Sequence, residues 1–158
     1  MRRTISMASV LHDIGKMEIG EQVLNSPEPR TPEDEEIMRQ HTLLGARMLE
    51  ELDAYRDEDF VRVAYQICRW HHERYDGSGY PDQLVGEQIP IAAQVVGLAD
   101  AYETLTTGSG SQPPVPCAAA VQMLCTGEAG AFNPVLLDCL REIENEIDDA
   151  MRRRPETL

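Results

Sequence analysis

Histidine and aspartate residues interrupt apolar segments of this chain at two widely separated places. The doublet His12-Asp13 lies inside a short apolar segment, and the pair His71-His72 ends another one. Burying such side chains is costly unless each finds a partner. A cluster of divalent metal ions would satisfy both segments at once. The sequence therefore favours a fold that brings these two segments together.

The spacing of apolar residues is helical almost everywhere and predicts an all-α bundle. Aromatic residues make up only 5% of the chain, so the core must consist of aliphatic side chains, which suits helices. Thr31-Pro32 and Asn133-Pro134 are typical helix starts. No segment shows a convincing strand pattern. The helices are predicted over residues 4–16, 32–52, 59–71, 90–102 and 134–154.

The length of 158 residues predicts a single domain, residues 1–158. Within it, residues 106–116 read TTGSGSQPPVP and are expected to form a flexible connection between helices. No apolar run approaches the length of about 20 residues that a membrane span needs. Membrane insertion is therefore not expected.

The formal net charge of −14 argues against non-specific binding to nucleic acid or to an anionic membrane. An anionic substrate would need bound cations that reverse the local charge. The four cysteines form no closely spaced pair, which favours reduced thiols and a cytoplasmic location.

Polar side chains at apolar positions form the candidate metal site. His41 and His71 lie on apolar helix stripes, where the alternative is a buried histidine bonded to the backbone. Asp100 ends the apolar run of residues 92–99, where the alternative is an ion pair with Arg69 or Arg74. A donor set without thiolates argues against structural zinc and suits two or more iron or manganese ions. The predicted ligands are His12, Asp13, His41, His71, His72 and Asp100.

Two residues of the first segment are predicted to take part in catalysis. The carboxylate of Asp13 can bridge two ions, an arrangement that stabilises displacement at phosphorus. Lys16 lies one helical turn from His12 and Asp13 and can direct its charge at a phosphoryl oxygen. The alternative for Lys16 is a solvated lysine at a helix end.

These segments resemble the HD-GYP family of phosphohydrolases. Residues 11–16, LHDIGK, resemble the HD signature, and residues 71–81, HHERYDGSGYP, resemble the second signature of HD-GYP proteins. Phe132-Asn133-Pro134 resembles a late Phe-Asp-Pro motif of the family. The resemblance extends over residues 9–140, and several separated motifs agree in order and spacing.

The resemblance implies a helical bundle with two or three metal ions, often iron or manganese. It implies hydrolysis of cyclic di-GMP, or in some relatives of cyclic GMP-AMP, by a metal-activated hydroxide. It assigns the six predicted residues to the metals and places Lys16 near the phosphate. It also links the loop Gly79-Tyr80-Pro81 to diguanylate cyclase domains, with a well-packed turn as the alternative.

Two differences from the family pattern lead to further expectations. The family has a helix with another metal-binding histidine before the HD motif, whereas no histidine precedes His12 here. We therefore expect a bundle that lacks the first helix, with an apolar face covered by dimerisation or by a partner chain. A natural loss, a truncated sequence and a helix supplied by another protein all remain open.

The second difference is that residues 108–114, GSGSQPP, replace a basic stretch that contacts substrate in the family. Hydrolysis by this chain is therefore expected to be impaired. The alternative is a catalytically degenerate HD-GYP domain used for signalling or protein interaction. An HD enzyme acting on another phosphate ester is a third reading, against which the long second signature counts.

Overall fold

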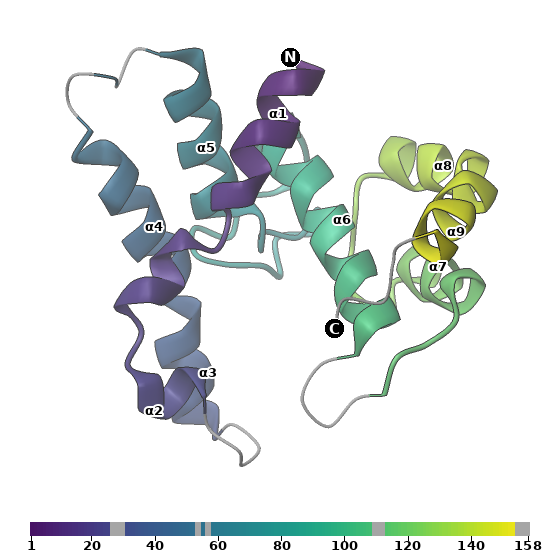
Figure 1. The fold of residues 1–158 in the computed structure, drawn as a ribbon, viewed down its shortest axis with the longest axis horizontal. Coiled ribbons are helices and arrows are strands. Elements are labelled where there is room, and N and C mark those ends of the chain that lie inside the picture. Colours follow the sequence, from purple (N-terminus) through teal and green to yellow (C-terminus); the bar gives the residue numbers. More distant parts are fainter. Residues whose placement is uncertain (26–30, 53–54, 56–57, 109–112, 154–158) are drawn as a thin grey trace. The chain divides into compact units, whose positions relative to one another are not determined.

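The computed structural model describes residues 1–25, 31–52, 55, 58–108 and 113–153, and their regular structure is helical (Figure 1). Over these ranges no strand is present, and the nearest approach to a sheet is an isolated bridge between Asp76 and Val85. The all-α prediction is confirmed. None of the helices described is both long and apolar enough to cross a membrane.

The chain forms two compact units, Met1–Ala99 and Asp100–Leu158. The boundary lies within one helix, α6 (Ile91–Thr107). The organisation as a single domain stays a prediction. The same holds for the flexible connection over residues 106–116, of which residues 109–112 lie outside the described part.

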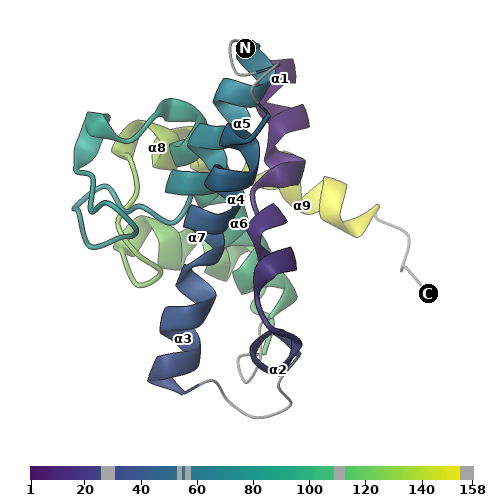
Figure 2. The same cartoon turned by 90° about the vertical axis from the view of Figure 1, so that its left-hand side faces the viewer.

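The first unit is built around two antiparallel helices, α4 and α5, which pack against each other (Figures 1 and 2). Helix α1 runs along α5, and the 3₁₀ helix η2 packs on α4. The elements before α6 are α1 (Arg2–Ala8), η1 (Ser9–Leu11), η2 (Ile14–Glu18), α2 (Glu21–Leu24), α3 (Pro32–Arg39), α4 (His41–Glu50), α5 (Asp59–Trp70) and η4 (Gly86–Gln88).

The core of the first unit is made of small and aliphatic side chains, as the scarcity of aromatic residues suggested. Ile67 and Cys68 of α5 are completely buried in it. Because α1, α4, α5 and the start of α6 share this core, the ends of α4 and α5 are held in place. The buried members of the cluster are Ala8, Leu49, Ala64, Ile67, Cys68, Ala92 and Val96.

Two predicted helices of this unit are interrupted. The helix expected over residues 4–16 changes after Ala8 into η1 and η2, with the His12-Asp13 doublet in the turn between them. The helix expected over residues 32–52 is divided at Gln40, whose N–H bonds to the carbonyl of Ile37 three residues earlier. In both places the apolar stripe continues through a tight turn, so the pattern alone does not reveal the break.

The predicted helix starts are confirmed by their caps. The Thr31 hydroxyl accepts a bond from the Asp34 N–H, and the Asp34 carboxylate accepts one from the Thr31 N–H, at 3.2 and 3.0 Å. This reciprocal pair is a capping box. The side chain of Asn133 likewise accepts a bond from the N–H of Val135, at 2.9 Å.

In the second unit, α7 (Cys117–Thr126) packs against α8 (Pro134–Glu142) and α9 (Glu144–Arg152). The single helix predicted over residues 134–154 is divided into α8 and α9 at Ile143. Helix α7 was not predicted. Its sequence, CAAAVQMLCT, is apolar on most sides and therefore lacks a clear helical stripe.

Candidate metal centre

The antiparallel arrangement of α4 and α5 brings two predicted ligands to the same end of the pair. His41 is the first residue of α4, and His71 directly follows the last residue of α5. Both side chains are almost fully buried, with 1% exposure each. The atoms of Asp13, His41, His71 and His72 that could bind a metal ion all lie within 4.8 Å of one another. The structure thus joins four of the six predicted ligands in one cluster.

Gly15 allows the segment with Asp13 to approach α4 closely. A methyl group at Gly15 would overlap the carbonyl oxygen of His41 and the backbone nitrogen of Gly45. The absence of a side chain at Gly15 therefore permits backbone contact between η2 and α4. This contact places Asp13 beside His41, with 3.3 Å between Oδ1 and Nε2.

Three of the histidines are oriented by the backbone. In each, Nδ1 lies within hydrogen-bond distance of a carbonyl oxygen three or four residues earlier, so the neutral ring donates from Nδ1 and keeps a lone pair on Nε2. Such bonds also fix the ring planes of metal ligands. The pairs are His12 with Ser9 at 2.7 Å, His41 with Met38 at 2.7 Å and His71 with Ile67 at 2.8 Å.

The centre of the cluster consists of acceptor atoms. Nε2 of His41 lies 3.5 Å from Nε2 of His71, and Asp13 Oδ1 lies 3.3 and 4.0 Å from these two nitrogens. Within the described part of the chain, this buried Oδ1 accepts no hydrogen bond. Burial lowers the pKa of His41 despite the nearby carboxylate, so a proton between the two groups is disfavoured. A metal cation fits this arrangement of facing lone pairs.

The dimensions of the cluster also suit a metal ion. Nitrogen and oxygen ligands bind divalent ions at about 2.0–2.2 Å, so opposite ligands lie about 4.4 Å apart at most. The largest separation in the cluster, within 4.8 Å, requires only a small inward movement of side chains. His72 completes the set, and burial, followed by the charges of His71 and His41, lowers its pKa. The neutral form that binds metal is therefore favoured.

His12 and Lys16 lie on the other side of the Asp13 carboxylate. Nε2 of His12 is 3.3 Å from Oδ2 of Asp13, and Nζ of Lys16 donates to the same oxygen at 2.5 Å. Lys16 is therefore bound to the cluster, although its side chain is 37% exposed. The two oxygens of Asp13 thus face different groups of side chains.

Asp100 lies in α6, at the start of the second unit, and its role as a ligand stays a prediction. Earlier in the same helix, a methyl group at Gly97 would overlap the carbonyl oxygen of His71, so α6 passes close to the end of α5. Of the two arginines considered as alternatives, Arg69 is bound to Asp82, with distances of 2.7 and 3.0 Å.

The sequence pattern predicts no role for Glu73, which follows the double histidine. Its buried carboxylate accepts the N–H groups of Asp82 and Leu84, at 2.7 and 3.1 Å. Burial raises the pKa of Glu73. The sequence contains one sign of this role: Glu73 directly follows a helix end that is expected to be buried, and a buried carboxylate needs hydrogen-bond donors. Glu73 thus holds the loop that contains Gly79-Tyr80-Pro81.

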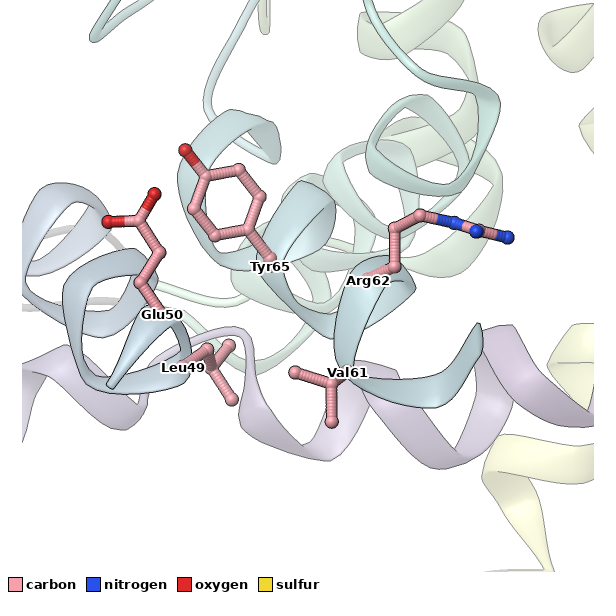
Figure 3. Close-up of a pocket in the computed structure, with 5 residues that line it drawn as sticks. All are labelled: Leu49, Glu50, Val61, Arg62 and Tyr65. Atoms are coloured by element: carbon pink, nitrogen blue, oxygen red, sulfur yellow. The ribbon is translucent and has the colours of Figure 1, made fainter. Parts of the chain in front are cut away.

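A separate pocket of about 500 Å³ lies at the opposite end of the α4–α5 pair (Figure 3). His41 and Leu49 are eight positions apart in α4, which corresponds to about 12 Å along a helix. In Figure 3 the side chain of Arg62 points away from Glu50. Burial raises the pKa of Tyr65. No predicted site residue lines this pocket, whose walls are Leu49, Glu50, Val61, Arg62 and Tyr65.

The sequence of this chain is similar to those of known proteins. The family described as HD domain matches residues 1–135. A cyclic di-GMP phosphodiesterase of Thermotoga maritima is 34% identical over 94% of this chain and 39% of its own length. The cyclic di-GMP phosphodiesterase response regulator RpfG of Xanthomonas campestris is 37% identical, with 87% of this chain and 35% of the relative covered.

A 3'3'-cGAMP-specific phosphodiesterase 2 of Vibrio cholerae is 31% identical over 87% of this chain and 26% of its own length. The chain thus spans well under half of the length of each of these relatives. The match to the HD domain covers both the HD motif and the double histidine, and the relatives carry the activities that the motifs implied. The chain therefore belongs to the HD domain family, and its resemblance to the HD-GYP type is confirmed.

Proposed function

We propose that this chain is a metal-dependent phosphodiesterase domain of the HD-GYP type that hydrolyses a cyclic dinucleotide, with cyclic di-GMP as the first candidate. The observation that carries the proposal is the cluster of facing acceptor atoms on Asp13, His41 and His71. The cyclic dinucleotide specificities of the relatives support the choice of substrate.

Bound divalent ions would supply a more acidic water molecule and positive charge for the phosphodiester. The protein contributes the positions of the atoms that would bind these ions. His41 and His71 are buried with their Nδ1 atoms bonded to backbone carbonyls, so they present Nε2 in a fixed direction. This rigidity limits reorganisation when the phosphodiester binds.

The proposal includes two or three ions of iron or manganese. The carboxylate of Asp13 supports more than one ion, since Oδ1 faces His41 and Oδ2 faces His12. Asp100 is included as a ligand of the same centre. Nitrogen and oxygen donors without thiolates favour these metals over structural zinc. The nearby thiol of Cys68 bonds to the carbonyl of Leu11 at 2.9 Å, and burial raises its pKa to about 12.

Lys16 is proposed to stabilise the negative charge of the phosphodiester. Its ammonium group binds Oδ2 of Asp13 and is also partly exposed, so it can approach a ligand without leaving the cluster. The net charge of −14 makes such local positive charge important for an anionic substrate. Asp13 would meanwhile be held in position by Lys16.

We further propose a cytoplasmic location and two kinds of protein contact for the domain. A cytoplasmic location is supported by four cysteines that are all free thiols. A signalling domain such as a diguanylate cyclase is proposed to contact the loop with Gly79, Tyr80 and Pro81. Val85, a few residues later, is 53% exposed and offers an apolar contact for such a partner. Dimerisation or a partner chain is proposed for the exposed apolar residues Met7, Val10 and Met17 of the first unit.

Metal analysis combined with a turnover assay tests the proposal. Purified protein should contain iron or manganese and should convert cyclic di-GMP to a linear product. His71→Ala should lose both metal and turnover, whereas Arg62→Ala, at an exposed site on the same helix, should retain both. A wild-type protein that binds no divalent metal at normal stability would exclude the proposal. Metal-loaded protein that binds cyclic di-GMP without cleaving it would favour the degenerate signalling domain.

A further inference from the structure

We propose that Tyr80 is a positioning residue that fixes the ring plane of His72 in the metal cluster. This inference rests on the proposed function, because it treats His72 as a metal ligand. The observation behind it is a stacked contact: the ring centroids of His72 and Tyr80 lie 4.8 Å apart, with an angle of 24° between the planes.

His72 differs from the other three histidines in how it is held. Those rings bond through Nδ1 to backbone carbonyls. In the described part of the chain, the ring of His72 makes no such bond and is surrounded by other rings. His71 lies 4.0 Å and His41 lies 5.1 Å from it, measured between ring centroids. Ring packing must therefore set the direction of the His72 nitrogens.

The loop backbone places Tyr80 over His72. The N–H of Tyr80 donates to the carbonyl oxygen of His72 at 3.3 Å. A methyl group at Gly79 would overlap backbone atoms of His72, Glu73 and Arg74, so only glycine allows the loop to lie so close to this segment. The Gly-Tyr sequence thus has an internal function: glycine permits the approach, and tyrosine supplies the ring that stacks.

Arg39 extends the stack outward. Its guanidinium carbon lies 5.2 Å from the centroid of the Tyr80 ring, a cation–π geometry. Arg39 ends α3, two residues before His41 begins α4. The stack therefore connects the loop to the helix junction that carries another member of the cluster. Rotation of the His72 ring would break the contact with Tyr80, which biases His72 toward one orientation.

The contact can be tested with two variants and a matched control. Tyr80→Leu should remove the stack, and Tyr80→Phe should retain it because the phenyl ring is unchanged. Tyr75→Leu is the control, since the Tyr75 hydroxyl donates to Glu87 at 2.9 Å within the same loop. Two measurements apply to all of them: NMR of the His72 ring protons in metal-free protein, and calorimetric titration with Mn²⁺.

The stack should shift the His72 ring protons upfield in wild type, Tyr80→Phe and Tyr75→Leu, and this shift should disappear in Tyr80→Leu. Loss of an outer partner of a metal ligand weakens metal binding by about 10- to 100-fold, so Tyr80→Leu should bind Mn²⁺ at least about 10-fold more weakly. Arg39→Gln leaves the tyrosine in place and should weaken binding by about two- to five-fold.

Equal Mn²⁺ affinity of wild type and Tyr80→Leu would overturn the inference and leave the proposed function intact. A wild-type protein that binds no Mn²⁺ would overturn both. If Tyr80→Leu does not fold, Arg39→Gln decides the question, because an unchanged affinity in that variant would contradict a positioning stack. The comparison with Tyr75→Leu separates loss of the stack from general damage to the loop.

Discussion

Oδ1 of Asp13 lies 3.3 Å from Nε2 of His41, and within the described residues no hydrogen bond joins the two atoms. The His41 ring donates from Nδ1 to the carbonyl of Met38, and burial keeps the ring neutral by lowering its pKa. Two lone pairs therefore face each other in a buried site. This arrangement is unfavourable without a cation and favourable with one.

Asp13→Asn should therefore have opposite effects in the absence and presence of metal. The amide can donate to Nε2 of His41, so the free energy of unfolding of the metal-free protein should rise by about 0.5–1.5 kcal/mol. The lost ion pair with the partly exposed Lys16 contributes little. Urea denaturation with and without Mn²⁺ measures both effects.

At a metal concentration of 100 times Kd, the free energy of unfolding of wild type should rise by about 2.7 kcal/mol. That of Asp13→Asn should not change when metal is added. Glu50→Gln is the matched control, since it removes a carboxylate from the far end of the same helix pair. A metal-free Asp13→Asn protein that is clearly less stable than wild type would contradict the idea of facing lone pairs.

Gly15→Ala should destabilise the protein by about 2–3 kcal/mol, because the new methyl group would overlap backbone atoms of His41 and Gly45. The overlap would also push Asp13 away from His41 and weaken Mn²⁺ binding. Gly20→Ala serves as the comparison: no atom lies within 4 Å of a methyl group there, and the cost should stay below about 1 kcal/mol. Thermal denaturation of both variants tests the difference.

Asp82→Asn should reduce stability by about 1–2 kcal/mol at neutral pH, because Asp82 accepts charge-assisted bonds from Arg69 and a bond from Trp70. The bond from Arg69 lowers the pKa of Asp82 below its ordinary value of 3.8. A lowered pKa stabilises the fold above pH 3.8, and this contribution is lost as the pH falls through the pKa of the folded state.

The stability difference between wild type and Asp82→Asn should therefore shrink below pH 3.8, as measured by urea denaturation across a pH series. Asp138→Asn is a control for an exposed pair, because Asp138 and Arg141 have side-chain exposures of 70% and 54%. Its effect should remain within about 0.5 kcal/mol. A constant difference for Asp82→Asn down to pH 2 would exclude the ion pair as its cause.

Cys68 should resist thiol reagents in the folded protein. It is completely buried, its thiol bonds to the carbonyl of Leu11, and burial raises its pKa to about 12. The reactive thiolate is therefore scarce at neutral pH. Cys139 is exposed and should react rapidly. Mass spectrometry after timed labelling distinguishes the two, and labelling of Cys68 at the rate of Cys139 would contradict the structure.

The helical class and the helix starts at Thr31 and Asn133 could be predicted from the sequence, because periodic apolar stripes determine the class and local caps determine the starts. The helix breaks near His12, at Gln40 and at Ile143 could not be predicted from it. At all three places the apolar spacing continues. Backbone bonds that span three residues, from His12 to Ser9 and from Gln40 to Ile37, mark the first two breaks. At Ile143 the N–H still bonds to Cys139 four residues earlier, and the backbone leaves the helical conformation, with φ −101° and ψ 8°. Boundaries of this kind depend on turns that the hydrophobic pattern does not record.

In the candidate site, too, local patterns could be predicted and three-dimensional contacts could not. His41 and His71 could be singled out, since each occupies an apolar helix position, and the structure brings them together with Asp13 and His72. The contact of Tyr80 with His72 could not be predicted. It depends on how closely the loop backbone passes at Gly79, which is a matter of three-dimensional packing.

The two bonds from loop N–H groups to Glu73 have a consequence for recognition. Asp82 and Leu84 belong to an irregular segment, yet one buried carboxylate tethers both of their N–H groups to the end of α5. The conformational entropy of this segment is thus lost during folding, before any ligand arrives. A molecule that binds there meets a preorganised surface, so little of its binding free energy is lost to ordering the loop.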